Sequence, residues 1–411
     1  MVNVLVIGSG ARESALGKAF LASPQVETVF VAPGNAGMPL LGLTLVPLYE
    51  DDTASLIAFA RTNVALTFVG PEQPLAAGLV DAFQDAGLAI FGPTAELAQL
   101  ESSKQFAKAF MARHGLPTAT ATVAHDLAAA QAAVQAAGLP VVIKADGLAA
   151  GKGVTVATTA AAATSALQAL YADHPAAPVL IEQYLSGAEA SVLAMFNGTT
   201  RVLFPLAQDH KRRFDGDEGP NTGGMGAISP APQFTTHQRE QAAALVDQTL
   251  AGMAADGLDG CGVLYLGLMF TAAGPKLLEY NLRFGDPETQ VLLPQVENDF
   301  YQLTVDLMSG AAEPLTLTGR TYVGVVAAHP GYPQATTPVL PVVTPALEAR
   351  NDWLPAGIAH GTDGLQTGGG RVFTVVGVGD TPAAAQASAY DRLRPLLGLL
   401  ASRTDIGAKA L

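Results

Sequence analysis

Glu279, Asn281 and Arg283 stand at every second position within GPKLLEYNLRFGDPE, residues 274–288, with apolar residues between them. This period of two is that of a half-buried strand, on which the three polar side chains would share one face. A carboxylate and an amide oxygen are hard ligands suited to Mg²⁺, which usually also binds oxygens of a substrate phosphate. A guanidinium beside them can bind a phosphate or a carboxylate through two hydrogen bonds. Taken alone, the stretch fits equally well an edge strand with a solvated polar face.

A second stretch that could do chemistry is the run KADGLAAGKGV, which begins at Lys144. Gly147, Gly151 and Gly153, together with Lys152, would form a mobile loop that brings backbone N–H groups and a cation to a triphosphate. The spacing is not that of a Walker loop, because Gly153 follows Lys152 where a hydroxyl residue would be needed to hold magnesium. A flexible hairpin turn is the alternative, and the two lysines of the run favour the phosphate loop.

Two further polar stretches are candidate binding segments. The run VLIEQY, 179–184, reads as a strand whose end could present backbone groups to an adenine edge, and Glu189 could bind ribose hydroxyls or be a surface acid. The run QDHKRRFDGDEGPNTGGMGAISP, 208–230, is expected to be a long loop without regular structure, and such loops are usually functional or disordered. Its basic start and its closely spaced glycines favour an anion site, in which His210 would orient or bind substrate.

The composition limits the classes of function. A chain of 411 residues, 49% hydrophobic and 14% charged, is globular, and its length suggests about two to four domains. The net charge of −14, without a long basic run, disfavours a general affinity for nucleic acid or anionic membranes. Cys261 is the only cysteine, so an intrachain disulfide and a cysteine-based metal site are excluded and a buried, inert thiol is expected. With no membrane-length apolar stretch and no basic leader, we expect a cytoplasmic protein.

The N-terminal part alternates strands and helices. The opening run MVNVLVIGSG is a strand that closes on glycines, followed by a helix over 11–20, an arrangement that can receive a phosphate or be a plain turn. Because Glu13 stands where a dinucleotide fingerprint would have its third glycine, NAD binding is disfavoured. Strands over 28–31, 65–69 and 88–91 end in PGNAG, GPE and GPT, which indicates a parallel α/β domain with its ligand edge at these loops.

The rest of the chain also alternates. Helices are expected over 101–114, 126–137, 238–255 and most of 288–310, and strands over 119–123, 140–144, 262–270, 322–328 and 371–376. The strand 262–270 and the stretch 274–288 would form a hairpin. The Pro-rich and Gly-rich segment 329–370 ends in GGGRV, which could approach a nucleotide or simply begin a strand.

These motifs resemble the ATP-grasp ligases, and within them the phosphoribosylamine–glycine ligase family. The resemblance rests on PGNAG, GPE, ESSKQFAKAF, KADGLAAGKGV, DHKRRFDGDEGPNTGGMGAISP and LLEYNLRFGDPETQ, with GGRV from residue 368 consistent with it. It implies an α/β and α+β multidomain fold with a parallel α/β domain, an ATP-grasp core with a mobile lid subdomain, and a small C-terminal domain. The corresponding residues would be 1–99 for the N-terminal domain, 100–122 and 189–320 for the core, 123–188 for the lid and 321–411 for the C-terminal domain.

The resemblance implies the ATP-dependent joining of glycine to 5-phosphoribosylamine in de novo purine biosynthesis, giving glycinamide ribonucleotide, ADP and phosphate. The glycine carboxylate would first become an acyl phosphate, a step that needs charge neutralisation and alignment more than a nucleophilic side chain. Mg²⁺ or Mn²⁺ would assist, and the partners would be these small molecules, with no nucleic acid and no membrane. A monomer is expected, with a homodimer as the alternative. Rival hypotheses are another ATP-grasp carboxylate–amine ligase, a nicotinamide-dependent oxidoreductase that uses the GSGARE turn, and a non-catalytic nucleotide sensor.

Carried over position by position, the family's roles imply metal binding by Glu279 and Asn281 and catalysis by Arg283, Lys211 and Asp209. Lys104, Lys144, Gly147, Gly151, Lys152 and Gly153 would contact the ATP phosphates, Glu182, Gln183, Tyr184 and Leu185 would line the adenine, and Glu189 would bind the ribose. Phosphoribosylamine would lie among Gly10, Arg12, Glu13, Pro33, Gly34, Asn35, Ala36, Gly37, Asp209, His210, Lys211, Asn221, Thr222, Gly223, Gly224, Met225, Gly226 and Arg283.

The sequence departs from the family's usual pattern at several positions. Ala11 and Ser14 replace a glycine and a histidine in the first turn, so the resemblance gives no role to the side chain at position 14. Gln183 replaces an acid in the adenine hinge, a mild change if the backbone makes the contact. No acid stands in 262–270, so Glu279 is expected to be the main protein charge on the metal.

Overall fold

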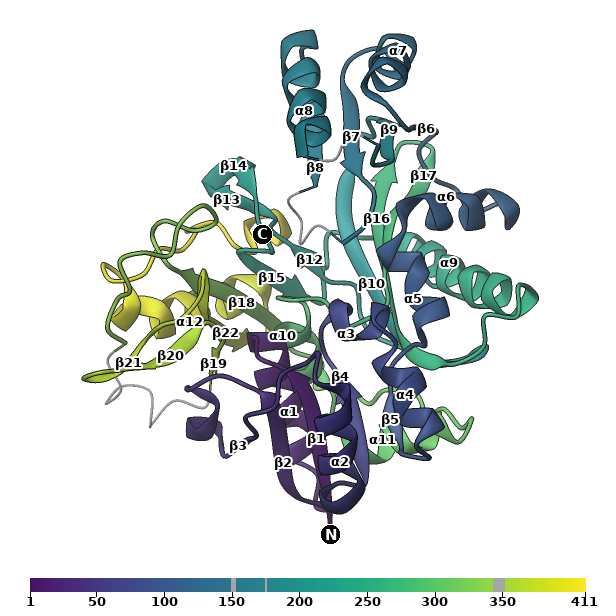
Figure 1. Ribbon diagram of the computed structural model, residues 1–411. Helices are drawn as coiled ribbons and strands as arrows, with labels where there is room; N and C mark the ends of the chain where they lie inside the picture. Colours follow the sequence, from purple (N-terminus) through teal and green to yellow (C-terminus); the bar gives the residue numbers. More distant parts are fainter. Residues whose placement is uncertain (149–152, 174–175, 343–351) are drawn as a thin grey trace.

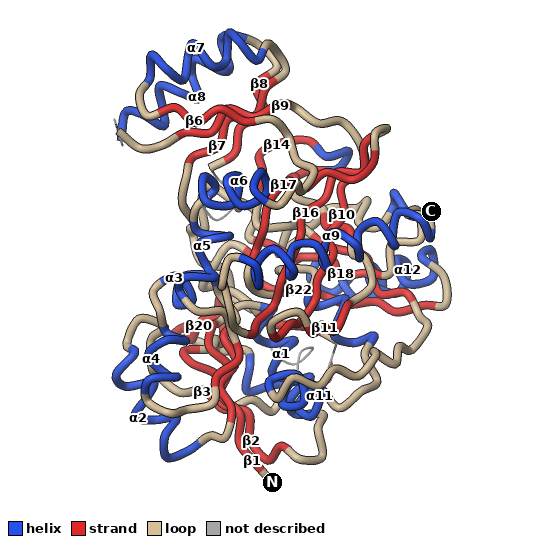
Figure 2. Tube along the Cα trace, turned by 90° about the vertical axis from the view of Figure 1, so that its right-hand side faces the viewer, coloured by secondary structure: helices blue, strands red, loops and turns tan. Residues whose placement is uncertain are grey.

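The computed structural model describes residues 1–148, 153–173, 176–342 and 352–411. In Figure 1 the N-terminal domain lies at the bottom, the C-terminal domain at the left, and the helices α7 (Leu127–Ala137) and α8 (Ala160–Asp173) project at the top. Figure 2, turned by 90°, shows the same projecting unit at the end of the molecule opposite the N-terminus. The predicted multidomain α/β architecture is confirmed. Among the described residues, no helix is both long and apolar enough to cross a membrane.

The N-terminal domain contains a parallel five-stranded sheet in the order β3-β2-β1-β4-β5. Its central strand is buried on both faces, since Val4 and Val6 enter one core cluster and Leu5 and Ile7 enter another. The strands are β1 (Val2–Gly8), β2 (Val26–Pro33), β3 (Thr44–Leu45), β4 (Leu66–Val69) and β5 (Ile90–Phe91). The helices are α1 (Ala11–Leu21), η1 (Met38–Leu41), α2 (Thr53–Asn63), α3 (Glu72–Ala76), α4 (Leu79–Asp85) and α5 (Ala95–Ser102).

The projecting unit, which we call the lid, is an antiparallel sheet in the order β6-β9-β7-β8 that packs against α7 and α8. It has a small apolar core of its own, which includes Val141, Ile143 and Ile181. The strands are β6 (Ala121–Ala124), β7 (Val141–Ala145), β8 (Val154–Ala157) and β9 (Val179–Gln183). Because β7 carries Lys144 and β9 carries Glu182, the lid brings charged side chains to the rest of the molecule.

The central sheet is antiparallel, in the order β11-β10-β16-β17, and contains the predicted hairpin. Its register places Gly267 opposite Glu279 and Tyr265 opposite Asn281, so the strand before Glu279 offers no acid there. The apolar side of β17 packs into the core with α9, which leaves the polar side open. The elements are β10 (Ala188–Asn197), β11 (Thr200–Leu203), α9 (Thr236–Ala255), β16 (Cys261–Thr271) and β17 (Gly274–Asn281).

The helix predicted over 101–114 is interrupted, and the stretch 288–310, predicted to be largely helical, is helical in three pieces. Within 101–114, α5 ends at Ser102 and α6 (Lys104–Arg113) begins, because Ser103 is extended and its Oγ accepts a hydrogen bond from the Phe106 N–H at 3.2 Å. Within 288–310, the chain forms α10 (Thr289–Leu292), η3 (Leu293–Gln295) and α11 (Phe300–Met308). The Asp299 side chain caps α11, so a new helix begins there rather than an old one continuing.

The run 208–230, predicted to lack regular structure, contains short strands instead. The prediction was wrong because a polar, glycine-rich run has no apolar period, whereas β15 is held by backbone pairing with the distant strand β18. The C-terminal sheet has the order β12-β15-β18-β22-β19, so it takes strands from both sides of residue 321. The elements are β12 (Gln208–Asp209), β13 (Arg212–Phe214), η2 (Asp215–Asp217), β14 (Glu218–Asn221), β15 (Gly226–Ser229), β18 (Thr321–Ala328), β19 (Trp353–Pro355), β20 (Ile358–Gly361), β21 (Gly364–Thr367), β22 (Arg371–Gly379), α12 (Pro382–Leu393), η4 (Arg394–Leu396) and η5 (Ala408–Ala410).

Candidate active site

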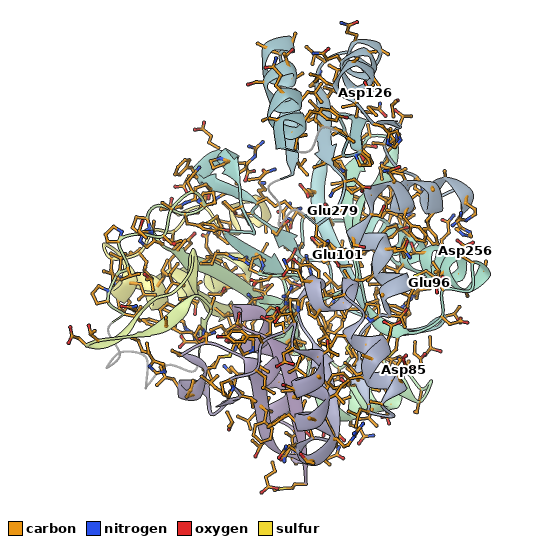
Figure 3. The ribbon with its side chains drawn as sticks, viewed as in Figure 1. Asp85, Glu96, Glu101, Asp126, Asp256 and Glu279 are labelled. Atoms are coloured by element: carbon orange, nitrogen blue, oxygen red, sulfur yellow. The ribbon has the colours of Figure 1, made fainter. Side chains whose placement is uncertain are left out.

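A cavity of about 300 Å³ lies where the lid, the central sheet and the N-terminal and C-terminal domains meet. Glu101 and Glu279, labelled near the middle of the molecule in Figure 3, both line it. Its walls carry charged and polar side chains from segments far apart in the sequence. They include Arg12, Glu72, Glu101, Lys104, Lys108, Lys144, Glu182, Asp209, Lys211, Tyr265, Glu279, Asn281, Arg283, Asp286, Glu288 and Arg371.

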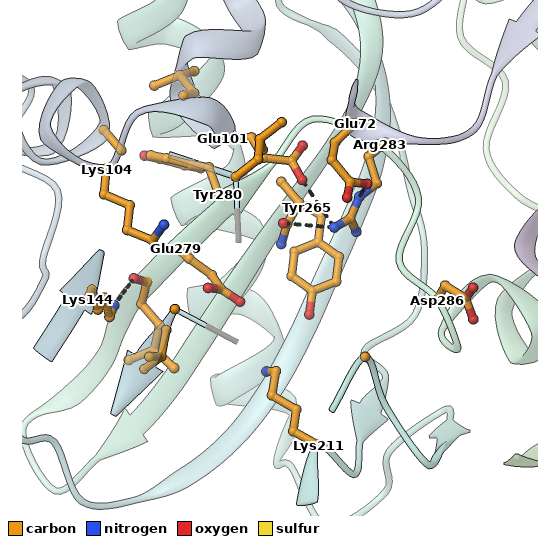
Figure 4. Close-up of a pocket in the computed structure, with 18 of the residues that line it drawn as sticks. Glu72, Glu101, Lys104, Lys144, Lys211, Tyr265, Glu279, Tyr280, Arg283 and Asp286 are labelled. Carbon is orange, nitrogen blue, oxygen red and sulfur yellow. Dashed lines mark hydrogen bonds and ion pairs between the residues drawn. The ribbon is translucent and has the colours of Figure 1, made fainter. Parts of the chain in front are cut away.

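Glu279 projects from β17 into this cavity (Figure 4). Within the described part of the chain its carboxylate has no hydrogen bond and no ion pair. Although burial opposes the effect, the positive charges of Lys211 and Lys144 lower the pKa of Glu279. The Asn281 Oδ1 atom, two residues along the strand, accepts a hydrogen bond from Arg283 Nη2 at 3.2 Å.

The pair Glu279 and Asn281 fits a hard divalent cation. A carboxylate without a protein partner and a neighbouring amide oxygen supply two oxygen ligands, and such a cation completes its shell with water and phosphate oxygens. The described residues contain no group of three or more His, Cys, Asp and Glu that could hold a metal ion. Glu279 and Asn281 are therefore the pair that could hold a metal together with water and substrate oxygens.

Arg283 is held in place by two acids from the N-terminal half of the chain. Its Nε atom pairs with Glu72 Oε2 at 3.2 Å and its Nη2 atom with Glu101 Oε1 at 3.1 Å. The second oxygen of Glu101 accepts the Leu282 N–H at 2.7 Å, which ties the end of α5 to the backbone beside Arg283. Burial would lower the pKa of Arg283, but the two acids raise it, so the guanidinium stays charged.

Lysines from the lid and from α6 form a second wall. Lys144 Nζ pairs with Glu182 Oε2 at 2.8 Å and donates to the Leu278 carbonyl at 3.1 Å, while Lys108 Nζ pairs with Glu182 Oε1 at 3.3 Å. Lys104 Nζ donates to the Gly147 carbonyl at 2.7 Å. Burial lowers the pKa of Lys104, and the charge of Glu279 opposes this. These side chains join the lid to the edge of β17 across the cavity.

Asp209, the last residue of β12, and Lys211, which directly precedes β13, both line the cavity. Lys211 Nζ lies 3.5 Å from Asp209 Oδ2 and also pairs with Glu189 Oε1. Burial raises the pKa of Asp209 to about 7; Lys211 opposes this shift, and the carboxylates of Glu288 and Glu189 add to it. Burial alone would lower the pKa of Lys211, but Asp209 and Glu189 raise it well above its ordinary value.

The first glycine turn holds a carboxylate of the protein. The Gly10 N–H donates to Glu13 Oε2 at 2.6 Å, and Arg12 Nε donates to Glu13 Oε1 at 2.5 Å. A Cβ atom at Gly8 would lie 2.5 Å from Glu13 Cγ, and one at Gly70 would lie 2.0 Å from Glu13 Oε1. The space that a dinucleotide pyrophosphate would need is filled by this side chain. Arg12, by contrast, lines the cavity.

The loop 33–37 lies between two domains and outside the cavity lining. Asn35 Nδ2 donates to the Ser9 carbonyl at 2.8 Å and to the Pro355 carbonyl at 3.2 Å, and the Ala36 N–H donates to the Ile358 carbonyl at 3.2 Å. Ser14, which the family pattern left without a role, donates its Oγ–H to the same Pro355 carbonyl at 2.6 Å. These bonds fasten the N-terminal domain to the C-terminal domain.

The glycine-rich loop 221–226 is divided between the cavity and the protein interior. Thr222 and Gly223 line the cavity, whereas Asn221, Gly224, Met225 and Gly226 are not among its lining residues. Arg371, at the end of the GGGRV run, lines it too and donates from Nη1 to the carbonyls of Gly223 at 2.7 Å and Asp286 at 2.8 Å. The structure therefore uses this arginine to hold the loop.

Several predicted site residues lie elsewhere. Of the adenine hinge, only Glu182 lines the cavity, and Tyr184 is 42% exposed. His210 is buried against the C-terminal segment, where its Nε2 atom accepts the Gly407 N–H at 3.3 Å. Gly151 and Lys152 lie outside the described residues, while Gly147 and Gly153 line the cavity.

Sequence reasoning gave no role to a further set of cavity residues. Glu72 and Glu101 stand in the GPE and ESSK motifs, which the sequence analysis identified. That both pair with Arg283 is not evident from the sequence, because the three residues lie far apart in it. Tyr265 stands in an otherwise apolar strand and carries no charge, and Glu288 directly follows the sequence GDP. The residues concerned are Glu72, Glu101, Lys108, Tyr265, Asp286, Glu288 and Arg371.

A lid of antiparallel strands, lysines from the lid and the adjoining helix, and the E-x-N strand surround one cavity. This is the arrangement of an ATP-grasp ligase. Comparison with protein families matches residues 2–101 to the N domain, 102–289 to the ATP-grasp (A) domain and 322–409 to the C domain of phosphoribosylglycinamide synthetase. The chain belongs to this family, whose members use ATP and a divalent metal, and the assignment predicted from the sequence is confirmed.

Individual relatives agree with this assignment. The chain is 45% identical to phosphoribosylamine–glycine ligase of Streptococcus pneumoniae and 44% identical to that of Halalkalibacterium halodurans, covering 100% and 97% of those chains and 100% of this one. The crystal structure of phosphoribosylamine–glycine ligase from Thermotoga maritima matches with a TM-score of 0.85 at 33% identity, over 98% of this chain and 100% of that one. N5-carboxyaminoimidazole ribonucleotide synthetase from Thermus thermophilus shares the fold, with a TM-score of 0.65 at 19% identity over 96% and 98% of the two chains.

Proposed function

We propose that the protein joins glycine to 5-phosphoribosylamine at the expense of ATP, giving glycinamide ribonucleotide, ADP and phosphate in de novo purine biosynthesis. The observation that carries the proposal is the Glu279 carboxylate, which faces the cavity without a partner among the described residues and lies among lysines next to Arg283. Glycyl phosphate is the intermediate. A carboxylate oxygen of glycine attacks the γ-phosphorus and ADP leaves; the amine of phosphoribosylamine then attacks the acyl carbon, and the released phosphate carries away the proton that the amine loses.

ATP would lie between the lid and β17. Lys104 and Lys144 would neutralise its phosphates, and the ion pair of 2.8 Å between Lys144 and Glu182 supports this role because it holds Lys144 at the cavity. The stretch 144–154, of which only part is described, would close over the phosphates. The hinge 182–185 would contact the adenine through its backbone, and Glu189 would bind the ribose after releasing Lys211.

Glu279 and Asn281 would hold Mg²⁺, with Mn²⁺ as a substitute, and the metal would neutralise charge on the transferring phosphoryl group. Arg283 would bind the glycine carboxylate or the acyl phosphate, because its guanidinium is fixed by Glu72 and Glu101 before substrate arrives. Lys211 would bind the same phosphoryl group from the opposite wall. Figure 4 shows Lys211, Glu279 and Arg283 on three sides of a common space around Tyr265.

Phosphoribosylamine would enter from the side of Arg12, Thr222 and Gly223, which line the cavity next to Arg371. The anchored loop 33–37 and the 221–226 loop would form the edges of this part of the site. We propose a monomer, with a homodimer as the alternative, in the cytoplasm, where ATP and the purine precursors are available; light scattering of the purified protein measures the oligomeric state.

The experiment is an assay of ADP release and product mass. Purified protein with ATP, Mg²⁺, glycine and phosphoribosylamine should release ADP and form glycinamide ribonucleotide, and omission of any component should abolish the product. Chelation of the metal should stop the reaction, and Mn²⁺ should restore it. ADP release that depends on another amine and not on phosphoribosylamine would contradict the proposal and indicate a different ATP-grasp ligase.

A further inference from the structure

Three buried side chains form a hydrogen-bonded group at the cavity wall. Ser191 Oγ and Tyr265 Oη lie 2.7 Å apart, and Glu288 Oε1 accepts from Tyr265 at 3.0 Å and lies 3.2 Å from the Ser191 hydroxyl. Ser191, Tyr265 and Glu288 are 1%, 3% and 3% exposed. The two hydroxyls fix one oxygen of the Glu288 carboxylate in place.

The charge of Glu288 has no cationic partner within 4.0 Å in the part of the chain that the structure describes. Its second oxygen, Oε2, lies so close to Gly285 that a Cβ atom there would be 2.4 Å away. A carboxylate that is removed from water without a counter-charge is strongly destabilising. Glu288 lines the cavity, so the missing cation can come from a bound molecule.

Asp209 adds a second carboxylate to the same part of the cavity. Its side chain is 7% exposed, and its cationic neighbour, Lys211, is shared with Glu189. Among the carboxylates that raise the pKa of Asp209, Glu288 has the largest effect, which shows that the two acids repel each other across this space. Three acids and one lysine leave this corner with an excess of negative charge.

We propose that Glu288 and Asp209 bind the ammonium group of the substrate whose carboxylate is activated, and that Ser191 and Tyr265 position Glu288 for this contact. The inference rests on the proposed function, in which that substrate is glycine. Arg283, Glu279 and Asn281 line the same cavity and would take the carboxylate end. A small substrate with an ammonium group and a carboxylate separated by one carbon could then contact both sets of side chains.

This contact has a chemical consequence. An amine that is held as an ammonium ion has no free electron pair, so it cannot attack an acyl phosphate. The amine of phosphoribosylamine is then the nucleophile that forms the amide bond. The same contact discriminates against carboxylates that lack an amine, because they would leave Glu288 and Asp209 without a counter-charge.

The test compares Glu288→Gln with Glu297→Gln, the same substitution at an exposed site outside the cavity. Loss of a charge-assisted contact should raise the KM for glycine by about tenfold to a hundredfold in Glu288→Gln, with the KM values for ATP and phosphoribosylamine changed less than about twofold. Glu297→Gln should match the wild type. Tyr265→Phe keeps the charge but loses one orienting hydroxyl, and it should raise the glycine KM by a smaller factor while kcat changes little.

A second measurement uses the wild-type protein and needs no variant to fold. Glycinamide carries the ammonium group without the carboxylate and should inhibit competitively against glycine; its inhibition constant should rise in Glu288→Gln. Glycolate carries the carboxylate without the ammonium group, and its inhibition constant should fall in Glu288→Gln, because the variant has one carboxylate fewer to leave without a counter-charge.

The outcomes separate this inference from the proposed function. If the wild-type protein makes no glycinamide ribonucleotide, the proposed function itself is contradicted. An active wild type in which glycinamide does not compete with glycine overturns the ammonium site. An unchanged glycine KM in folded Glu288→Gln overturns the ammonium site as well. A rise confined to the KM for phosphoribosylamine also overturns it, because the acids would then contact the amine of phosphoribosylamine.

Discussion

The segment 208–217 contributes to two groups of charged residues that are built differently. Asp209 and Lys211 point to the cavity, whereas His210 and Asp217 contact residues near the C-terminus. We call the first the cavity group and the second the C-terminal group. The cavity group comprises Lys104, Lys144, Glu182, Asp209, Lys211, Glu279, Arg283 and Glu288, and the C-terminal group comprises His210, Asp217, Arg403, Asp405 and Lys409.

In the C-terminal group the cations and acids are matched within the protein. The Arg403 side chain is 1% exposed and pairs with Asp217 at 2.9 Å and with Asp405 at 2.7 Å, and Lys409 also pairs with Asp217. Although burial opposes the shift, hydrogen bonds from Arg403 and Lys409 lower the pKa of Asp217. The cavity group, by contrast, includes Glu279 and Glu288, which lack a cationic contact among the described residues.

The difference separates a structural role from a chemical one. Charges that are matched within the chain stabilise its fold, while charges left unmatched in a cavity are available to a ligand. Substitutions in the C-terminal group should change stability and leave turnover alone, and substitutions in the cavity group should do the reverse. Substitutions at Glu279, Arg403, His210 and Asp209 test this contrast.

The largest expected effect is that of Glu279→Gln. Loss of the metal-binding charge should lower kcat by at least about a thousandfold, with little change in the free energy of unfolding. Steady-state kinetics over a range of Mg²⁺ concentrations and chemical denaturation measure the two quantities. Near-normal kcat at saturating Mg²⁺ would contradict the role of this residue in metal binding.

Arg403→Met should lower the free energy of unfolding by about 2–4 kcal/mol, because Asp217 and Asp405 lose a buried partner while remaining partly solvated. The kcat of the folded fraction should not change. The control is Arg394→Met, which removes an exposed pair with Asp391 and should cost less than about 1 kcal/mol. Both are measured by urea unfolding, and equal losses in the two variants would contradict the distinction.

His210→Gln tests the C-terminal group through pH. Burial lowers the pKa of His210 to about 4, and the charges of Arg403 and Lys409 add to this shift. Between about pH 6.5 and 4 the unfolded chain therefore binds a proton that the folded chain does not, and the wild type loses up to about 3 kcal/mol as the pH falls. The variant should lack this loss. Asp209 has the opposite effect on the free energy of unfolding, because its raised pKa makes the folded chain bind the extra proton. Both proteins contain Asp209, so its contribution cancels when their free energies of unfolding are subtracted.

The same variant separates the predicted substrate role of His210 from a structural one. If His210 contacts phosphoribosylamine, the KM for that substrate should rise in His210→Gln, and if it belongs to the C-terminal group alone, the KM should be unchanged. Initial rates at neutral pH, where both proteins are folded, decide between the two.

The smallest expected effect concerns Asp209. Because its pKa is raised to about 7, kcat/KM for glycine in the wild type should fall about tenfold for each pH unit below that value, as the carboxylate becomes protonated. Asp209→Asn should have a lower kcat/KM that is flat over the same range. An acid limb of the same position in both proteins would assign it to another group.

Much of the site could be predicted because its signals are local. Glu279 and Asn281 alternate on β17, and Arg283 follows two residues after its end. All three line the cavity, as does Lys144 of β7. The same alternation explains why His210 does not join its two sequence neighbours in the cavity. His210 lies between Asp209 and Lys211, and successive side chains of an extended chain point to opposite sides.

The remaining features depend on contacts between distant segments. Glu72 and Glu101 meet Arg283 only because the N-terminal domain docks against the central sheet, and no local pattern records that docking. The strands in 208–230 likewise depend on β18. Ser103 is different, since a serine before a helical run is a recognisable cap, and it could have divided the helix predicted over 101–114.

The pairing of β15 with β18 also constrains how the polypeptide can be made and cut. β15 leaves the ribosome before α9, β16, β17 and α11, and its partner emerges only after all of them. Until β18 is synthesised, the edge of β15 that pairs with it has no native neighbour. In a fragment that ends before residue 321 this edge stays unpaired. An unpaired strand edge promotes association with other chains. The C-terminal domain therefore completes the sheet that carries the 221–226 loop, because it supplies β18.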